Sequence, residues 1–223
     1  GLIFMKWGVS KVSIPVFDLE SSINFYNFIL GNDIETKIND IDFLDEYYVC
    51  GGNIELRLYK LKNELSNNHS SQSRRTFPTL ALNNLDLIVK SLKDDGINYS
   101  TNEHDKSIII QEPGLNFIEL INLETSKKFS KREKNNKWNF HHINLECYDV
   151  RSSVNFVSQY LKMKEGGWKA PIELGKVNIK PNQLAIFNLD DNHSGIHINK
   201  ADFTFSWRNN FMHNPTIGGH PAF

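Results

Sequence analysis

The sequence predicts an α+β fold built from repeated β-α-β-β-β units that pair into curved mixed sheets. Three segments share one pattern: a short apolar strand, an Asp or Asn, an aliphatic residue and then an amphipathic helix. They begin at Lys11, Phe77 and His142, which lie 66 and 65 residues apart. A hairpin pattern follows each helix. We therefore expect one complete two-unit domain followed by a truncated second domain.

Each expected helix carries one apolar stripe and a capping residue at its start. The stripe consists of Leu19, Ile23, Tyr26 and Leu30 in unit one, Leu85, Val89 and Leu92 in unit two, and Val150, Val154, Val157 and Leu161 in unit three. This spacing is typical of a helix that buries one face. Asp18, Asn84 and Asp149 stand where an N-cap side chain accepts the first free backbone N–H groups.

Turn residues mark a hairpin after each helix. The expected hairpins pair Glu46–Cys50 with Ile54–Tyr59, Ser107–Gln111 with Asn116–Asn122, and Leu184–Leu189 with Ile196–Asn199. Each unit has room for one more strand before its hairpin. A fourth strand pattern opens at His220, so the chain is expected to be a fragment.

Composition excludes several functional classes. Lys plus Arg is 25 and Asp plus Glu is 26, which gives a net charge of −1 and no electrostatic footprint for nucleic acid. No apolar run approaches the roughly 18–20 residues that cross a membrane. Cys50 and Cys147 cannot form a disulfide framework, which fits a reducing compartment. We expect a cytoplasmic globular protein.

The segments VSIPVFDLESSINFYNFILG and PGLNFIELIN resemble the first strand-helix and the last strand of the vicinal-oxygen-chelate superfamily. This superfamily includes glyoxalases, bleomycin-resistance proteins and extradiol dioxygenases. The resemblance covers nearly all of residues 8–223 and implies that two units form one domain around a metal-holding concave sheet. It implies a first domain over 8–124, a linker over 125–137 and a truncated second domain over 138–223. The basic linker is expected to be solvated, although a phosphate-binding or nucleic-acid-binding role stays open for it.

In the family, metal ligands come from the first and last strands of each unit. The resemblance places the first-strand positions at Lys11, Phe77, His142 and His220, and the last-strand positions at Glu55, Glu119 and His197. An ammonium and a phenyl ring cannot replace imidazoles, so the first domain is expected to bind no metal. His142 and His220 are expected to hold a divalent metal, with Fe(II) first and Mn, Zn or Ni as alternatives. The completing carboxylate would lie beyond Phe223.

Other candidate residues surround this expected site. His197 alternates with Ile196 and Ile198 and so faces the opposite side of its strand. A ligand, an acid–base group and a structural polar residue stay open as roles for His197. His193 is a second acid–base candidate. Trp207, Arg208, His213 and Asn214 belong to a loop that could line a substrate pocket or form an interface.

The resemblance implies a metal-dependent enzyme that acts on a small oxygenated organic substrate. It is most like an extradiol ring-cleavage dioxygenase or a glyoxalase-type lyase or isomerase, in which a metal acts as a Lewis acid on two vicinal oxygens. The alternative is a non-catalytic small-molecule-binding protein of the bleomycin-resistance kind. This fragment, without its third ligand, is expected to be inactive. The expected partner is a small molecule, with no nucleic acid and no membrane, and a homo-oligomer stays open.

Overall fold

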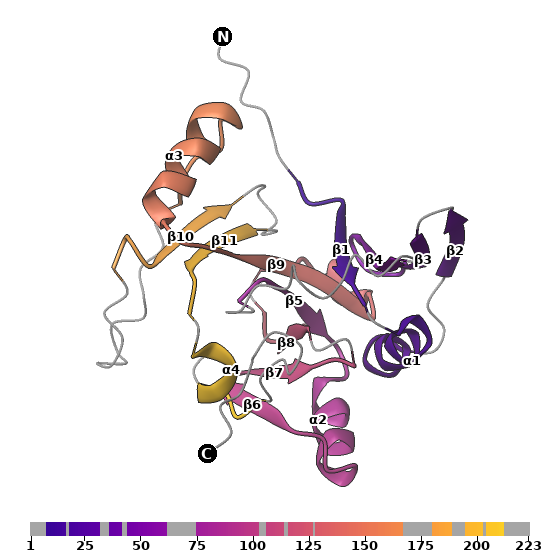
Figure 1. The fold of residues 1–223 in the computed structure, drawn as a ribbon. Coiled ribbons are helices and arrows are strands. Elements are labelled where there is room, and N and C mark those ends of the chain that lie inside the picture. Colours follow the sequence, from indigo (N-terminus) through magenta and orange to yellow (C-terminus); the bar gives the residue numbers. More distant parts are fainter. Residues whose placement is uncertain are drawn as a thin grey trace, which may run out of the picture.

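The computed structural model describes residues 8–16, 18–31, 36–41, 44–61, 75–102, 106–113, 116–126, 128–166, 180–188, 195–202 and 204–211. It contains three copies of one supersecondary unit, arranged as two sheets with helices against them (Figure 1). The predicted α+β fold of repeated units is confirmed. Within the described residues, no helix has the length and apolar character needed to cross a membrane.

Units one and two have the same order of elements. Unit one consists of β1 (Lys11–Pro15), α1 (Leu19–Leu30), β2 (Thr36–Ile41), β3 (Leu44–Val49) and β4 (Glu55–Leu61). Unit two consists of β5 (Phe77–Leu82), α2 (Leu85–Asp94), β6 (Tyr99–Asn102), β7 (Ser107–Gln111) and β8 (Phe117–Asn122). In both units the first strand lies parallel to the last, and the remaining strands follow as antiparallel neighbours.

The described part of unit three follows the same arrangement. It consists of β9 (Trp138–Cys147), α3 (Val150–Tyr160), β10 (Leu184–Asn188) and β11 (Gly195–Lys200), with the short helix η2 (Glu133–Asn135) before it and α4 (Phe205–Arg208) after it. Strand β11 is parallel to β9 and antiparallel to β10. Before β10, a single antiparallel bridge joins Glu165 to Phe187, and residues 167–179 lie outside the described part of the chain.

Capping explains the starts of two of the three repeated helices, α1, α2 and α3. The Asp18 carboxylate accepts the Ser21 backbone N–H at 2.7 Å, and the Asp149 carboxylate accepts the Ser152 N–H at 3.1 Å. The predicted cap at Asn84 is wrong, because this side chain makes no capping hydrogen bond. Helix α2 begins there without side-chain help.

The sheets pair the units differently from the sequence-based expectation. The sequence predicts that units one and two share a sheet, whereas the second sheet has the order β10-β11-β9-β5-β8-β7-β6 and joins units two and three. Its centre is the antiparallel pair of first strands, β5 and β9. Unit one forms a separate sheet with the order β1-β4-β3-β2. The sequence repeat shows that the units are equivalent. Because the first strand of every unit has the same kind of edge, the repeat does not determine which two first strands pair.

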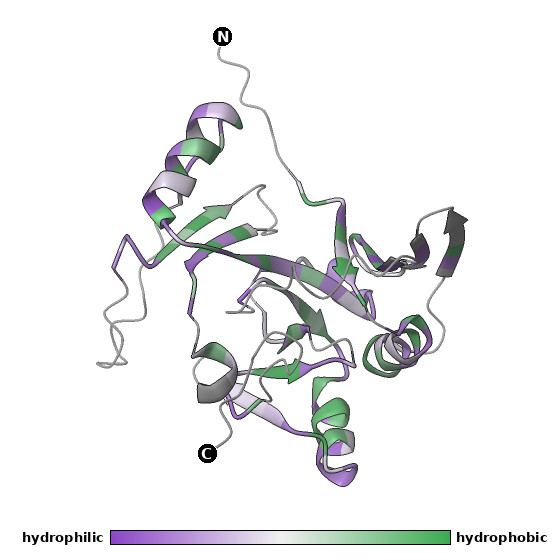
Figure 2. Ribbon diagram, in the orientation of Figure 1, coloured by the Kyte–Doolittle hydropathy of each residue, from purple (hydrophilic) through white to green (hydrophobic). Residues whose placement is uncertain are grey.

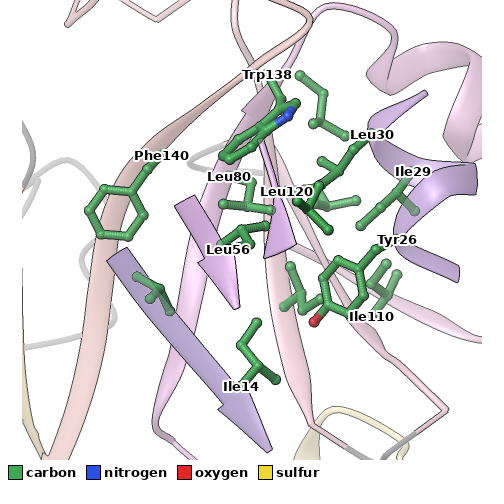
Figure 3. Packing of buried hydrophobic residues seen from close by; sticks show 14 of the residues in the cluster. Ile14, Tyr26, Ile29, Leu30, Leu56, Leu80, Ile110, Leu120, Trp138 and Phe140 are labelled. Carbon is green, nitrogen blue, oxygen red and sulfur yellow. The ribbon is translucent and has the colours of Figure 1, made fainter. Parts of the chain in front are cut away.

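Unit one nevertheless shares its hydrophobic core with unit two. Apolar residues alternate along the strands (Figure 2), and one face of each sheet points into a single cluster. Tyr26, Ile29 and Leu30 of α1 lie in this cluster with Leu80 and Leu120 of the second sheet (Figure 3). The cluster is the reason why unit one stays attached without sharing a sheet.

A turn of unit one also contacts β9 directly. The Asn53 side-chain amide accepts a hydrogen bond from the Phe140 backbone N–H at 2.6 Å and donates one to the Phe140 carbonyl at 3.2 Å. These are the two hydrogen bonds that the backbone of a neighbouring strand would make. Gly52 lies so close to Trp138 that a Cβ atom there would be 2.6 Å from the indole ring. Only glycine fits this approach.

The segment expected to be a solvated linker is partly packed. Phe129 is 6% exposed and clusters with Ala81 and Leu123 of unit two. The Asn83 side chain donates to the Lys134 carbonyl at 3.2 Å. Residues 128–137 therefore lie against the second sheet rather than apart from it.

Candidate functional site

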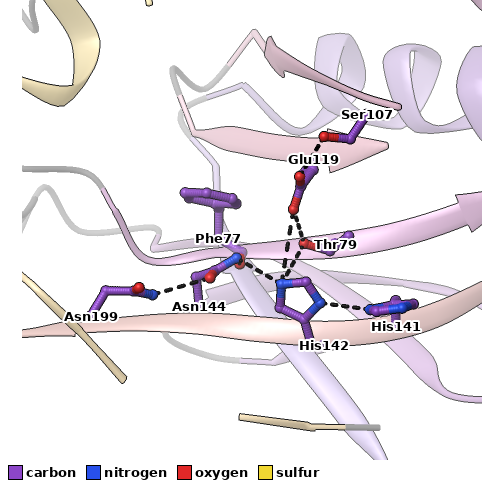
Figure 4. Close-up of polar contacts among 8 residues, drawn as sticks. All are labelled: Phe77, Thr79, Ser107, Glu119, His141, His142, Asn144 and Asn199. Atoms are coloured by element: carbon purple, nitrogen blue, oxygen red, sulfur yellow. Dashed lines mark hydrogen bonds and ion pairs between the residues drawn. The ribbon is translucent and has the colours of Figure 1, made fainter. Parts of the chain in front are cut away.

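A group of polar side chains occupies the middle of one face of the second sheet (Figure 4). We call this group the polar centre, and it consists of Thr79, Ser107, Glu119, His141, His142, Asn144, His197 and Asn199. Its members come from both paired units, on strands β5, β7, β8, β9 and β11. The polar centre thus lies across the junction of the units.

A β-bulge turns His142 toward this face. Along β9, Trp138 and Phe140 pack into the core shared with unit one. The register with β5 then shifts: Leu80 pairs with Phe140 but Thr79 pairs with His142, which leaves His141 as the extra residue. Without that extra residue, His142 would follow Phe140 into the core.

Glu119 lies at one end of the hydrogen-bonded network. Its carboxylate accepts the Thr79 hydroxyl at 2.6 Å and the Ser107 hydroxyl at 2.7 Å, and its side chain is 14% exposed. The distance from Glu119 Oε2 to His142 Nε2 is 3.9 Å. Thr79 Oγ1 is closer to that nitrogen, at 3.0 Å, and stands between the carboxylate and the imidazole.

These contacts assign the tautomer of His142. Because Thr79 gives its proton to Glu119, its oxygen can only accept, and His142 Nε2 therefore carries the hydrogen. His142 Nδ1 then accepts from Nδ1 of His141, which is 2.7 Å away. Asn144 Nδ2 lies 3.2 Å from His142 Nε2, but it has the Phe77 carbonyl as another acceptor at 3.5 Å.

Both buried imidazoles are neutral near pH 7. Burial holds the pKa of His142 well below 6.5, and the nearby His197, His141 and Lys128 lower it further. Burial also lowers the pKa of His197 to about 4, with a contribution from the Lys128 charge. The two rings stack with centroids 3.8 Å apart and planes 21° from parallel. Two charged rings could not stay stacked so closely at low cost.

An aromatic cluster covers one end of this face. Phe205 and Phe211, from α4 and the residue stretch after it, pack on Phe77 and Phe117 of unit two. The predicted pocket residues Trp207 and Arg208 belong to α4, but their side chains lie outside the described part of the chain, as do His213 and Asn214. Their proposed contacts with substrate stay predictions.

The donor set of the polar centre matches the metal that the resemblance implies in kind but not in geometry. Two neutral imidazoles and a carboxylate are suitable donors in kind. Two ligands of one ion, each about 2.1 Å from it, lie roughly 3.0–3.4 Å apart, whereas Glu119 and His142 are 3.9 Å apart with the Thr79 hydroxyl between them. Among the described residues, no three His, Cys, Asp or Glu side chains could hold a metal ion. As arranged, these groups do not fit a metal.

The structure brings together some of the predicted site residues and separates others. His142 and His197 meet, and Glu119, which the sequence assigns to a metal-free domain, joins them. His193 and His220 lie outside the described residues, so their roles stay predictions. Sequence reasoning missed Thr79, Asn144 and Lys128. The only signal for the first two was their place two residues after Phe77 and His142 on the same strand faces.

Unit one holds the equivalent positions away from this site. Lys11 pairs in register with Glu55, whose carboxylate is 3.8 Å from Lys37 Nζ. These residues line an open cavity of about 600 Å³ beside the turn at Gly52. The lysine and glutamate side chains there are well exposed, so we place the candidate site at the polar centre and not in this cavity.

Comparisons with known proteins identify similar folds. A candidate dioxygenase from Bacillus subtilis has a TM-score of 0.57 at 11% identity, over 87% of this chain and 64% of that one. A glyoxalase I mutant from Zea mays has a TM-score of 0.56 at 12% identity, over 86% of this chain and 68% of that one. This chain therefore spans less than two thirds of the dioxygenase. No family model and no curated protein matches. The two structures confirm the family resemblance of the sequence at the level of the fold.

Proposed function

We propose, on the premise that this chain has the fold of the vicinal-oxygen-chelate superfamily, that its polar centre binds a small oxygen-bearing organic molecule. The observation that carries the proposal is the junction of the paired units, where a neutral imidazole, a hydroxyl and a carboxylate meet on one sheet face. Such a set offers both donors and acceptors to neighbouring oxygens of a ligand.

Each group has a distinct task in this proposal. His142 presents Nε2–H, which can donate to a ligand oxygen in place of Thr79. The Glu119 carboxylate accepts a ligand hydroxyl, since it already accepts two hydroxyl groups of the protein. Asn199 donates to the Asn144 amide oxygen at 3.1 Å and so fixes the amide beside His142. The aromatic cluster around Phe205 would shield one side from water.

The second candidate function is the metal-dependent dioxygenase, lyase or isomerase that the family resemblance implies. One observation favours it: His142 and His197 are both kept neutral, which is the state that binds a divalent metal, and Glu119 is nearby. The side chains would have to leave their present arrangement to share an ion. Because the described geometry does not hold a metal, we assign no chemical step to one.

Titration of the full chain with catechol and with glycolamide tests the first candidate. Both are neutral molecules with heteroatoms on adjacent carbons, and NMR detects weak binding of either. His142→Gln and Glu119→Gln should each weaken binding about tenfold, the effect of losing one good hydrogen bond. The repeat supplies matched controls, Lys11→Gln and Glu55→Gln, which should leave binding unchanged. Equal effects of the two pairs of variants would contradict the proposal.

Metal analysis separates the two candidates. The chain is dialysed against Fe(II), Mn(II), Ni(II) or Zn(II) and the retained ion is counted. One equivalent retained by the wild type and lost in His142→Gln would favour the metal-dependent enzyme. Substoichiometric metal together with retained ligand binding would favour the metal-free binding site.

A further inference from the structure

Strand β1 of unit one is an edge strand. Among the described strands it pairs only with β4, whereas its equivalents β5 and β9 each pair with a last strand on one side and with each other on the other side. Figure 1 shows β4, β3 and β2 all to the same side of β1. Lys11, Ser13 and Pro15 of this strand are exposed. Within the described part of the chain, unit one therefore lacks the junction of first strands that the other two units share.

The alternation of hydrogen bonds along β1 identifies the backbone groups at its outer edge. The Ser10 carbonyl and the Val16 N–H both bond to β4, at 3.1 and 2.9 Å. Both groups belong to even-numbered residues, so the N–H and C=O groups of the odd-numbered residues point away from β4. Lys11 and Ser13 each present a donor and an acceptor there. Pro15 has no N–H, and its carbonyl is already hydrogen-bonded to unit two.

The junction of units two and three supplies a register for two such edges. Before the bulge, three residue pairs join its first strands: Phe77 with Asn144, Pro78 with Ile143, and Thr79 with His142. The first, second and third positions of one strand thus meet the third, second and first positions of the other, so this stretch has local two-fold symmetry. The strands that begin at Lys11, Phe77 and His142 are equivalent in the repeat. Applied to two copies of β1, the same register pairs Lys11 with Ser13 of the second copy.

This register uses the outward backbone groups of β1. In an antiparallel pair, residues whose N–H and C=O groups point at the partner exchange both hydrogen bonds. Lys11 and Ser13 of the two copies would therefore form four hydrogen bonds, with Pro15 outside them. Like charges would not face each other, because the Lys11 ammonium would lie opposite the neutral Ser13 side chain. The two-fold axis repeats each contact, so the interface closes as a dimer and does not extend into a filament.

We propose that two copies of this chain associate through the outer edges of their β1 strands, antiparallel and with Lys11 opposite Ser13. The partner is a second copy of the chain, and the sheet of unit one continues across the two-fold axis into the sheet of the other copy. Each unit would then have its first strand paired with another first strand. The interface lies in unit one, so the proposal does not depend on what the polar centre binds.

Sedimentation of the full chain over a dilution series tests for this dimer, since one copy has a mass of 25.8 kDa. The wild type should shift from monomer to dimer as its concentration increases. Ser13→Pro should weaken association about tenfold, because it removes one outward N–H from each copy and leaves the hydrogen bonds to β4 in place. The matched control Ser13→Ala retains this N–H and should associate like the wild type.

Disulfide cross-linking tests the register without a proline. The two Val12 residues would form the central pair, which makes no hydrogen bonds to each other and brings the Cα atoms about 4.5 Å apart, a separation that a disulfide spans. Val12→Cys should therefore give a covalent dimer on a non-reducing gel. Ile14→Cys is the matched control, because Ile14 is equally buried but its two copies would lie roughly 14 Å apart. The wild type, with free Cys50 and Cys147, gives the background.

The results separate this interface from other arrangements of β1. A wild type that stays monomeric at every concentration would refute the proposal. If a dimer forms but Ser13→Pro and Ser13→Ala associate equally well, another surface holds the copies together and the proposal is wrong. Cross-linking of Ile14→Cys as readily as Val12→Cys would exclude the proposed register. If Ser13→Pro does not fold, the wild-type dilution series and the two cysteine variants still decide.

Discussion

Acidification should destabilise the folded chain through the stacked histidines of the polar centre. Burial, and then the charge of Lys128, lowers the pKa of His197 to about 4. Burial holds the pKa of His142 well below 6.5 as well. In the unfolded chain both imidazoles titrate near 6.5. Below that pH the unfolded chain binds protons that the folded chain does not, so the free energy of unfolding decreases as the pH falls.

The contribution of His197 to this effect has a definite magnitude. The interval from 6.5 to about 4, at 1.36 kcal/mol per pH unit, corresponds to roughly 3 kcal/mol when complete. At pH 5 we expect the free energy of unfolding to be about 2 kcal/mol lower than at pH 7.5 from this residue. Urea denaturation followed by tryptophan fluorescence measures the difference. His197→Phe keeps a stacked ring without a titrating group, and should lose about 2 kcal/mol less than the wild type between these pH values.

The comparison between wild type and variant is the decisive one, because carboxylates also titrate near pH 5. Their contribution is common to both proteins and cancels. If the wild type and His197→Phe lose the same stability between pH 7.5 and pH 5, His197 does not titrate as its burial requires, and the reasoning is refuted.

Two further changes test the packing and the helix starts. Gly52→Ala would place a methyl group 2.6 Å from the fully buried Trp138 ring. It should lower the free energy of unfolding, measured by urea denaturation, by about 1–3 kcal/mol. The control Gly8→Ala should leave it unchanged, because no atom lies within 4 Å of the added methyl group. Asp18→Ala should lower the urea midpoint by removing a helix cap, and Asn84→Ala should lower it much less because the Asn84 side chain makes no capping hydrogen bond. Equal decreases of the midpoint would contradict the capping argument.

Local features of the fold could be predicted from the sequence because they depend on local chemistry. The stripe from Leu19 to Leu30 predicts the bounds of α1, and the Pro-Gly turn predicts the hairpin of β7 and β8. The pairing of units could not be predicted in this way. It depends on which first strand meets which, and β5 and β9 combine through contacts between residues more than 50 positions apart.

The candidate site was predictable in part for the same reason. The alternation of His197 with Ile196 and Ile198 predicts the face on which the imidazole lies, and the structure stacks that ring on His142. The packing of residues 128–137 against the second sheet was not predictable, because a basic run of this kind is usually solvated. The burial of Phe129 and the hydrogen bond from Asn83 to the Lys134 carbonyl reveal that the segment lies on the sheet.

The three copies of the unit show what creates the polar centre. Unit one has a carboxylate, Glu55, at the position of Glu119, yet among the described side chains Glu55 makes only a long ion pair with an exposed lysine. The difference is that β1 pairs only with β4 among the described strands, whereas β5 has β9 on its other side. Pairing of first strands buries Glu119 beside an imidazole of another unit. The chemistry therefore belongs to the junction of two repeats and not to any single one.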